Sequence, residues 1–393
     1  TTGENVAVGA SAMVASLGGT NNVAVGKGSM AANTTGNYNV AIGNSAMATS
    51  ETVSGITAIG RQALTAMTNG ATYNTAVGFD CLKTSTADSG NTAVGYNAGI
   101  TIDGGNFNTL MGAAVGDAIT TGDNNTAIGY GALTDANTGY SNVAIGYDAG
   151  KQITSGYKNV IIGDSSGGQS VDPQTGWENI IIGWNSGYNL TSGNSNVLIG
   201  VGSGYSLNND GDNIMIGYQS GYYHTGGPNT FVGRYAGRGT TGTSASLHNT
   251  AVGFDALTAI NQGDYNVAVG SYALDALTSR ACCTAVGYAA GTSYYGTSGT
   301  LNAFGHLALE DCTSGYANNA FGDGALANIT SGSLNVAIGS NAGAGVNAGG
   351  NIFIGVDTQS SAATDNSNTI IGYACNAGGT TANHRIVLSS GSL

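Results

Sequence analysis

Residues 125–150 read NTAIGYGALTDANTGYSNVAIGYDAG, and the motif that starts at Asn125 returns at Asn142, which gives a 17-residue interval. Outward from this stretch the same motif fills the chain. Most copies keep this interval, and the others follow at intervals of 16, 18 or 20. A short fixed period is the signature of a repeat architecture. We therefore predict one repeat array over residues 1–393, of about 23 coils, with a degenerate last coil at 373–393. The motif closes on a glycine, here the corner glycine, at positions 9, 26, 43, 60, 78, 95, 112, 129, 146, 163, 183, 200, 217, 233, 253, 270, 287, 305, 322, 339, 355 and 372.

The residues before each corner glycine form sharp columns. Asparagine stands four positions before it in 19 of the 22 motifs, and we call this the asparagine column. The next three residues are rich in valine, isoleucine and alanine, a composition typical of short strands. Strands stacked in register about 4.8 Å apart place identical residues above one another, so the asparagines are expected to form an amide ladder. Glycine allows a tight corner that a Cβ would obstruct. The predicted fold is all-β, a parallel β-solenoid or β-roll.

The position two before the corner glycine, here the strand-centre column, decides the expected assembly. We assign the valine or isoleucine that follows it to the coil interior, because successive side chains of a strand point to opposite faces. The strand-centre column then faces outward, yet it is apolar in all 22 motifs. Such a stripe promotes association, so we predict a parallel homotrimer with this column at its axis. The alternative is a lone solenoid with both columns in a flattened core. The larger residues of the column are Leu110, Ile161, Ile181, Leu198, Met215, Phe231, Phe353 and Ile370.

The motif N-[VT]-A-[VI]-G-x-x-[AS] resembles the repeat of trimeric autotransporter adhesin heads, which are left-handed parallel β-rolls. Its longer form, N-T-A-[VI]-G-Y-x-A-[LG] followed by TTG or TSG, resembles repeats of bacteriophage tail fibres, as in Asn91–Gly99 and Asn125–Leu133. The resemblance covers essentially the whole chain. Adhesin heads usually have shorter repeats, so the 17-residue spacing favours the tail fibre.

This resemblance implies a stiff structural spacer on a virion, a trimer of identical chains that contacts other tail proteins and presents a host-receptor surface. The alternative is a trimeric adhesin on a bacterial surface that binds host or matrix. The chain starts inside a repeat, so we expect it to be a fragment of a longer protein.

The composition and the sequence motifs give little support for catalysis, for metal or cofactor binding, or for binding to nucleic acids. The net charge is −13 and no basic run occurs, so no nucleic-acid partner is expected. No long apolar run occurs, so no membrane insertion is expected. Nucleotide-binding, metalloprotease and triad patterns are absent from the sequence, and we predict no enzyme, no metal site and no cofactor. A carbohydrate-cleaving tailspike, the enzymatic alternative, would need a carboxylate pair that the spacing does not supply.

The five cysteines show no CxxC spacing and are predicted to be small buried residues. A sharper alternative is a disulfide between chains through Cys282 or Cys283, in an oxidising compartment.

Aromatic residues in the turns carry the receptor prediction. They stand five or six positions before the corner glycine, beside asparagine, serine and threonine. Such rings stack on sugars and offer hydrogen bonds, so we predict contact with a host glycan or protein receptor. The competing interpretation is that they cover the groove between coils or chains. Rings directly after the corner glycine, such as Phe79 and Tyr96, are expected to form a structural ladder. The receptor candidates are Tyr38, Tyr73, Tyr140, Tyr157, Trp177, Tyr265 and Tyr316.

Overall fold

The fold is an all-β parallel solenoid with 23 strands and a 17-residue repeat, as the sequence predicts. The computed structural model describes residues 3–68, 70–169, 172–240, 244–295, 299–359, 364–376 and 383–390, and no helix occurs within these ranges. The chain divides into two compact units, Thr1–Asn196 and Val197–Leu393.

Each described coil contributes one short strand. The first unit contains β1 (Val6–Val8), β2 (Val23–Val25), β3 (Val40–Ile42), β4 (Thr57–Ile59), β5 (Thr75–Val77), β6 (Thr92–Val94), β7 (Thr109–Met111), β8 (Thr126–Ile128), β9 (Val143–Ile145), β10 (Val160–Ile162) and β11 (Ile180–Ile182). The second unit contains β12 (Val197–Ile199), β13 (Ile214–Ile216), β14 (Thr230–Val232), β15 (Thr250–Val252), β16 (Val267–Val269), β17 (Thr284–Val286), β18 (Leu301–Phe304), β19 (Asn318–Phe321), β20 (Val336–Ile338), β21 (Ile352–Ile354), β22 (Thr369–Tyr373) and β23 (Ile386–Ser390).

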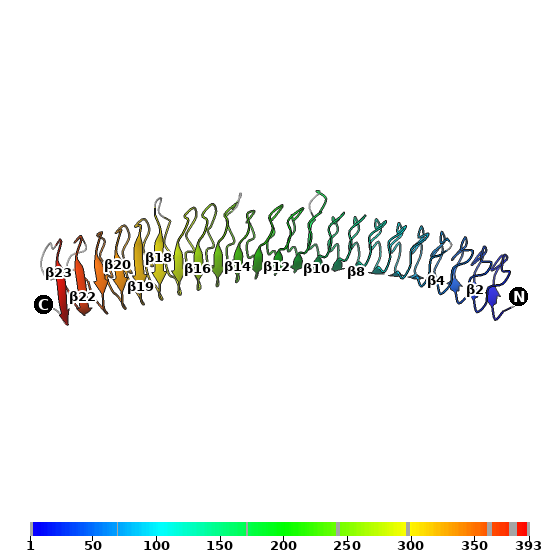
Figure 1. Ribbon diagram of the computed structural model, residues 1–393, viewed down its shortest axis with the longest axis horizontal. Helices are drawn as coiled ribbons and strands as arrows, with labels where there is room; N and C mark the ends of the chain where they lie inside the picture. Colours follow the sequence, from blue (N-terminus) through cyan, green and yellow to red (C-terminus); the bar gives the residue numbers. More distant parts are fainter. Residues whose placement is uncertain are drawn as a thin grey trace. The chain divides into compact units, whose positions relative to one another are not determined.

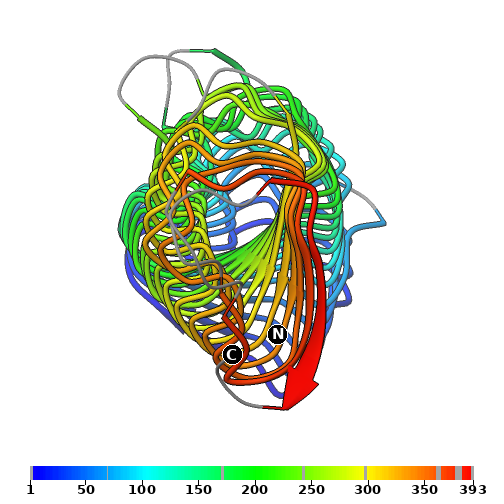
Figure 2. The same cartoon turned by 90° about the vertical axis from the view of Figure 1, so that its left-hand side faces the viewer.

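Strands of successive coils pair in parallel and in register within each unit. Thr126 of β8 pairs with Val143 of β9 in the first unit, and Val267 of β16 pairs with Thr284 of β17 in the second. Figure 1 shows the strands of each unit side by side, and Figure 2 shows the coils of each unit lying over one another. The sequence period therefore becomes a set of columns of equivalent residues.

The corner glycines end the strands in a conformation that requires glycine. Their φ angles lie between +123° and +148°, a region that residues with a Cβ rarely adopt. A Cβ on Gly163 would also lie 2.7 Å from the carbonyl oxygen of Gly183 in the next coil. Backbone conformation and close stacking thus both exclude a side chain at the corner, which confirms the prediction.

The asparagine column forms the predicted amide ladder. Asn142 is buried, and its backbone N–H donates to Oδ1 of Asn125 at 3.0 Å. Its Nδ2 donates to the same oxygen at 3.2 Å and to the carbonyl of Gly156 at 2.9 Å. Its own Oδ1 accepts from Asn159 in the following coil. Each such side chain therefore joins consecutive coils and leaves its buried polar atoms satisfied.

The predicted orientation of the strand residues is wrong. From Ala24 to Ile370 every strand-centre side chain is buried inside its own coil, with an exposed fraction of 0–1%. The residues one and three positions before the corner glycine point outward, and none of them is buried in β2–β22. Successive side chains of a strand point to opposite faces. Assigning the valine or isoleucine column to the interior therefore also placed the strand-centre column on the wrong face. The residues predicted at a trimer axis lie instead in the core of single coils: Leu110, Ile161, Ile181, Leu198, Met215, Phe231, Phe353 and Ile370.

Most large strand-centre residues fit inside because glycine faces them. We call the position four after the corner glycine the inner-turn column. Every leucine or methionine in that column shares its coil with a strand-centre alanine, whereas Phe231 shares its coil with Gly237. A Cβ on Gly167 would lie 2.8 Å from Cδ1 of Ile161. One large side chain therefore fills the interior of such a coil to close packing. This reciprocal pattern is a sequence signal that identifies the strand-centre column as interior.

The longest repeats carry insertions before Trp177 and around Ser244, between the strands. Parallel bridges between Ile153 and Gln174, and between His224 and Ser244, restore the register beside them. Residues 170–171 and 241–243 lie outside the described residues.

Candidate interaction surfaces

The outward side of the strands, here the strand face, is uncharged and largely apolar, with threonine or asparagine in half of the positions three before the corner glycine. It consists of the residues one and three positions before the corner glycine, as Val160 and Ile162 flank the buried Ile161. No residue of β1–β23 is charged, although the chain has 9 basic and 22 acidic residues. Ile42 is 38% exposed and Met111 is 48% exposed. In each unit, an uncharged and largely apolar face on an acidic chain is typical of an interaction surface.

Parts of the strand face expose large apolar side chains. In β9–β11 both outward positions are aliphatic, and Ile180 is 40% exposed. In the second unit Phe304 and Phe321 stack with ring centroids 4.9 Å apart and planes 5° from parallel. Burying such a side chain contributes about 1.5–3 kcal/mol, so covering the strand face would stabilise an assembly.

Three of the predicted receptor residues form a stacked ladder. The ring centroids of Tyr140 and Tyr157 are 4.8 Å apart, and those of Tyr157 and Trp177 are 5.7 Å apart, with nearly parallel planes. Beside the ladder, Lys158 and Glu178 form an ion pair at 3.1 Å. Both faces of Tyr157 are covered by its neighbours, so a sugar has no free face of this ring to stack on. The ladder joins successive coils, as the competing interpretation holds, and leaves only its two outer faces and its edges to a partner.

The receptor candidates Tyr38, Tyr73 and Tyr316 lie apart from the ladder. Tyr38 and Tyr73 are 68% and 75% exposed, and Tyr316 is 43% exposed. The ring of Tyr73 lies over Gly55 of the preceding coil, where a Cβ would lie 3.0 Å from Cδ1 of the tyrosine. These rings therefore remain available to a partner.

The aromatic residues directly after the corner glycine form stacks between coils, as expected. The ring centroids of Phe79 and Tyr96 are 5.6 Å apart, and those of Tyr130 and Tyr147 are 5.4 Å apart. Stacked pairs at such distances stabilise the contact between coils.

A notch beside Tyr265 is a feature that the sequence analysis missed. The repeat between Gly217 and Gly233 is shorter than most, and Pro228 stands there between coils that carry Asp212 and His248 at the same position. The imidazole of His248 stacks on Tyr265, with ring centroids 5.0 Å apart. The cavity has a volume of about 250 Å³ and is lined by Asp212, Pro228, Asn229, Thr230, His248, Asn249 and Thr250.

The chemistry of the notch suits a ligand rich in hydroxyl groups. A carboxylate, an imidazole and two threonine hydroxyls offer hydrogen-bond donors and acceptors. Asp212, which the sequence suggests is a turn former, therefore also lines a cavity. The shortened repeat was the signal that could have indicated it.

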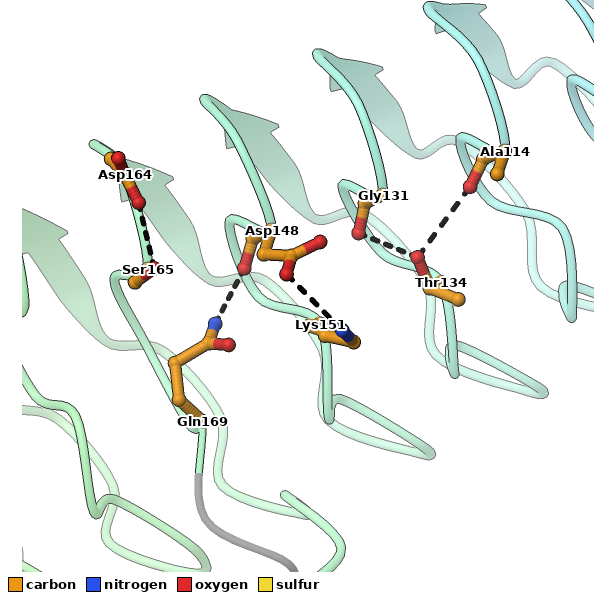
Figure 3. A network of polar contacts seen from close by, with 8 residues as sticks. All are labelled: Ala114, Gly131, Thr134, Asp148, Lys151, Asp164, Ser165 and Gln169. Atoms are coloured by element: carbon orange, nitrogen blue, oxygen red, sulfur yellow. Dashed lines mark hydrogen bonds and ion pairs between the residues drawn. The ribbon is translucent and has the colours of Figure 1, made fainter.

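Polar groups on the turns mostly bond to their own or adjacent coils, as Figure 3 shows. Lys151 Nζ lies 3.1 Å from Oδ2 of Asp148, and Gln169 Nε2 donates to the Asp148 carbonyl at 2.5 Å. Thr134 Oγ1 donates to the carbonyl of Gly131 at 2.6 Å. The Lys151 and Thr134 contacts stabilise single turns, and the Gln169 contact connects successive coils, so these groups have structural roles.

The cysteines and the potential metal ligands give little support for a reactive or metal-binding site. Cys81, Cys283, Cys312 and Cys375 are buried and Cys282 is exposed, all as free thiols. Burial raises the pKa of Cys81 to about 12, which keeps the thiol protonated. Among the described residues no group of three histidine, cysteine or acidic side chains is placed to hold a metal ion. In the same ranges no helix has the length and apolarity to cross a membrane.

Comparison of the sequence with protein-family models and with curated proteins finds no match. The resemblance to adhesin heads and tail fibres therefore depends on the repeat motif alone, and a function has to be argued from the surfaces.

Proposed function

We propose that this chain is a structural segment of a fibre, in which three parallel copies pack through their strand faces. The observation that carries the proposal is the uncharged, largely apolar strand face. A chain with a net charge of −13 repels its own copies, and the strand face is where two copies approach without bringing charges together.

A parallel arrangement matches the columns of one copy to the same columns of the next. The flanking residues repeat in every coil, so each contact made in one coil recurs in the following coil. The number of copies comes from the resemblance of the repeat to trimeric proteins, and the 17-residue spacing favours a tail fibre or similar virion appendage.

The remaining surface supports a role in host attachment. The exposed rings of Tyr38 and Tyr73 and the notch beside Tyr265 offer stacking and hydrogen-bonding groups away from the strand centre. The fibre would then act as a spacer that holds glycan-binding side chains at a distance from the particle.

The mass in solution tests the assembly. Light scattering on the purified chain should give about three times the chain mass of 38.7 kDa. Ile180→Asp places a charge on the strand face and should lower the mass while the circular dichroism spectrum stays unchanged. Ser195→Asp is the control, because Asp212 occupies the equivalent exposed position of the next coil. A monomer mass for the unaltered chain would refute the assembly.

Ile181→Asp tests the orientation of the strand. Ile181 is fully buried in its own coil, and an unpaired charge there is strongly destabilising. We expect this variant to lower the melting temperature far more than Ile180→Asp. The reverse order would mean that the strand-centre column faces outward after all.

Binding to arrayed bacterial surface polysaccharides tests attachment. His248→Ala with Tyr265→Ala removes the stacked wall of the notch and should weaken binding at least tenfold. Tyr130→Ala, which removes a ring directly after a corner glycine, is the matched control. An equal loss of binding in both variants, or no binding by the unaltered chain, would refute the attachment role. Neither result would bear on the proposed assembly.

A further inference from the structure

Two arginines and four aromatic rings gather on one surface of the second unit. Arg234 directly follows a corner glycine, and Arg238 lies four positions later in the same coil. We call this surface the arginine–tyrosine patch. It consists of Arg234, Arg238, Tyr218, Tyr223, Tyr235 and Phe254.

The guanidinium of Arg234 lies among three rings. Its Cζ is 5.5 Å from the ring centroid of Tyr218 in the preceding coil and 5.8 Å from that of Phe254 in the next coil. Its Cζ is also 4.8 Å from the centroid of Tyr235. The rings hold the cation in place through cation–π attraction. Arg234 is exposed, and Nη2 donates one hydrogen bond, to Oη of Tyr235 at 3.3 Å. Most of its five N–H donors therefore have no partner within the part of the chain that the structure describes.

Arg238 lies close to the same tyrosine. Its Cζ is 5.4 Å from the ring centroid of Tyr223 and 5.1 Å from that of Tyr235. Both guanidinium groups therefore lie beside the ring of Tyr235. Nε of Arg238 is buried and has no hydrogen-bond partner among the described residues. A buried donor without a partner is unfavourable, and an incoming acceptor would satisfy it.

Neither arginine forms an ion pair with an acidic side chain of the described residues. The ion pairs there use Lys83, Lys151, Lys158 and His306. Asp255 interacts electrostatically with both arginines, but its Oδ1 accepts from Thr258 Oγ1 at 3.4 Å rather than from a guanidinium. Two arginines beside one tyrosine are unusual in a chain with only 9 basic residues.

We propose that the arginine–tyrosine patch binds an anionic saccharide, with the two guanidinium groups on a carboxylate or sulfate and the rings against the sugar. Arginine matches the planar geometry of such oxyanions through paired N–H donors. Aromatic rings supply the apolar surface that a sugar ring covers. The site would identify an acidic polysaccharide as a target of the proposed attachment function, but binding to it can be measured without any fibre.

Titration with defined polysaccharides tests this site. The unaltered chain is titrated by calorimetry with alginate oligomers for the carboxylate, dextran sulfate for the sulfate and neutral dextran for the sugar alone. We expect binding to at least one acidic polymer and none to dextran, with weaker binding as salt screens the charges. Arg234→Gln with Arg238→Gln should weaken the acidic interaction at least tenfold.

Two further variants separate this site from general charge. Arg61→Gln is the matched control, since Arg61 also follows a corner glycine and lies 4.9 Å from the Phe79 ring centroid, but stands alone; its affinity should change less than twofold. Arg234→Lys with Arg238→Lys keeps the charge and should still lose several-fold in affinity. Equal affinity for dextran, unchanged binding in the glutamine variant, or no acidic binding by the unaltered chain would overturn the proposal. Light scattering on each variant reports the assembly separately.

Discussion

The corner glycines occupy positions where the coil does not accommodate any other residue. Their positive φ angles disfavour a side chain, and the next coil lies where a Cβ would stand. Gly18 differs, because its φ is not positive and a Cβ there would meet no atom within 4 Å. Position in the coil, rather than residue type, therefore decides the effect of a substitution.

Gly163→Ala should lower the free energy of unfolding by about 2–4 kcal/mol, because the new Cβ is strained and meets the Gly183 carbonyl. Gly18→Ala should change it by less than about 0.5 kcal/mol. Urea unfolding followed by circular dichroism measures both. Similar losses in the two variants would contradict the argument.

His224 is a titratable residue inside the coil. It is fully buried, its Nε2 lies 2.9 Å from the Ser246 carbonyl oxygen, and burial lowers its pKa to about 4. Leu190 and Leu207 occupy the same position in the two preceding coils. The imidazole is therefore a neutral core residue at pH 7.

Acid should destabilise the chain through His224. The unfolded histidine binds a proton near its ordinary pKa of 6.5, whereas the folded one does so only near 4. Stability is therefore lost as the pH falls through this window, by about 3 kcal/mol at its lower end. His224→Leu should reduce this loss, and His248→Ala, at an exposed histidine, should not. Melting temperatures measured from pH 7 to pH 4 compare the variants, and identical profiles would refute the assignment.

At the scale of the coil, the strand and the turn opposite it share one interior volume. Most large strand-centre residues occur with glycine in the inner-turn column, and leucine or methionine in that column occurs with alanine. Gly237 has φ +54° and Leu257, at the same position of the next coil, has φ +55°. The backbone there accepts leucine, so Phe231 alone excludes one from position 237.

A double-mutant cycle tests this exchange of volume. Phe231→Ala should cost about 3–4 kcal/mol by leaving a cavity, and Gly237→Leu about 1–3 kcal/mol by overpacking. The double variant recreates the pair found as Ala251 and Leu257. We expect it to be less destabilised than the sum by at least about 1 kcal/mol, measured by urea unfolding. Strict additivity would mean that the two positions do not share a space.

At the scale of the whole molecule, charge and apolar surface are separated. The acidic and basic residues all lie outside the strands, and the strand face carries none. An assembly through this face is apolar, while the rest of each acidic copy repels its neighbours.

Self-association should therefore strengthen as salt is added. Screening weakens the repulsion between copies of charge −13 and leaves the apolar contact intact. Sedimentation velocity at about 0.05 M and about 0.5 M NaCl should show more assembly at the higher concentration. Dissociation by salt would indicate ionic contacts between copies and would contradict packing through the strand face.

The sequence by itself determined the repeat, the single strand in each coil, the asparagine ladder and the corner glycines, because each is a local requirement repeated at one period. It also placed most aromatic candidates on the surface. The tertiary structure decided which side of a three-residue strand is interior, since the residues one and two before the corner glycine are both apolar and alternation alone allows either phase. The volume that Phe231 shares with Gly237 resolves that choice. The notch beside Pro228 and the clustering of Arg234 and Arg238 around Tyr235 likewise depend on side chains from neighbouring coils, which only the stacking brings together.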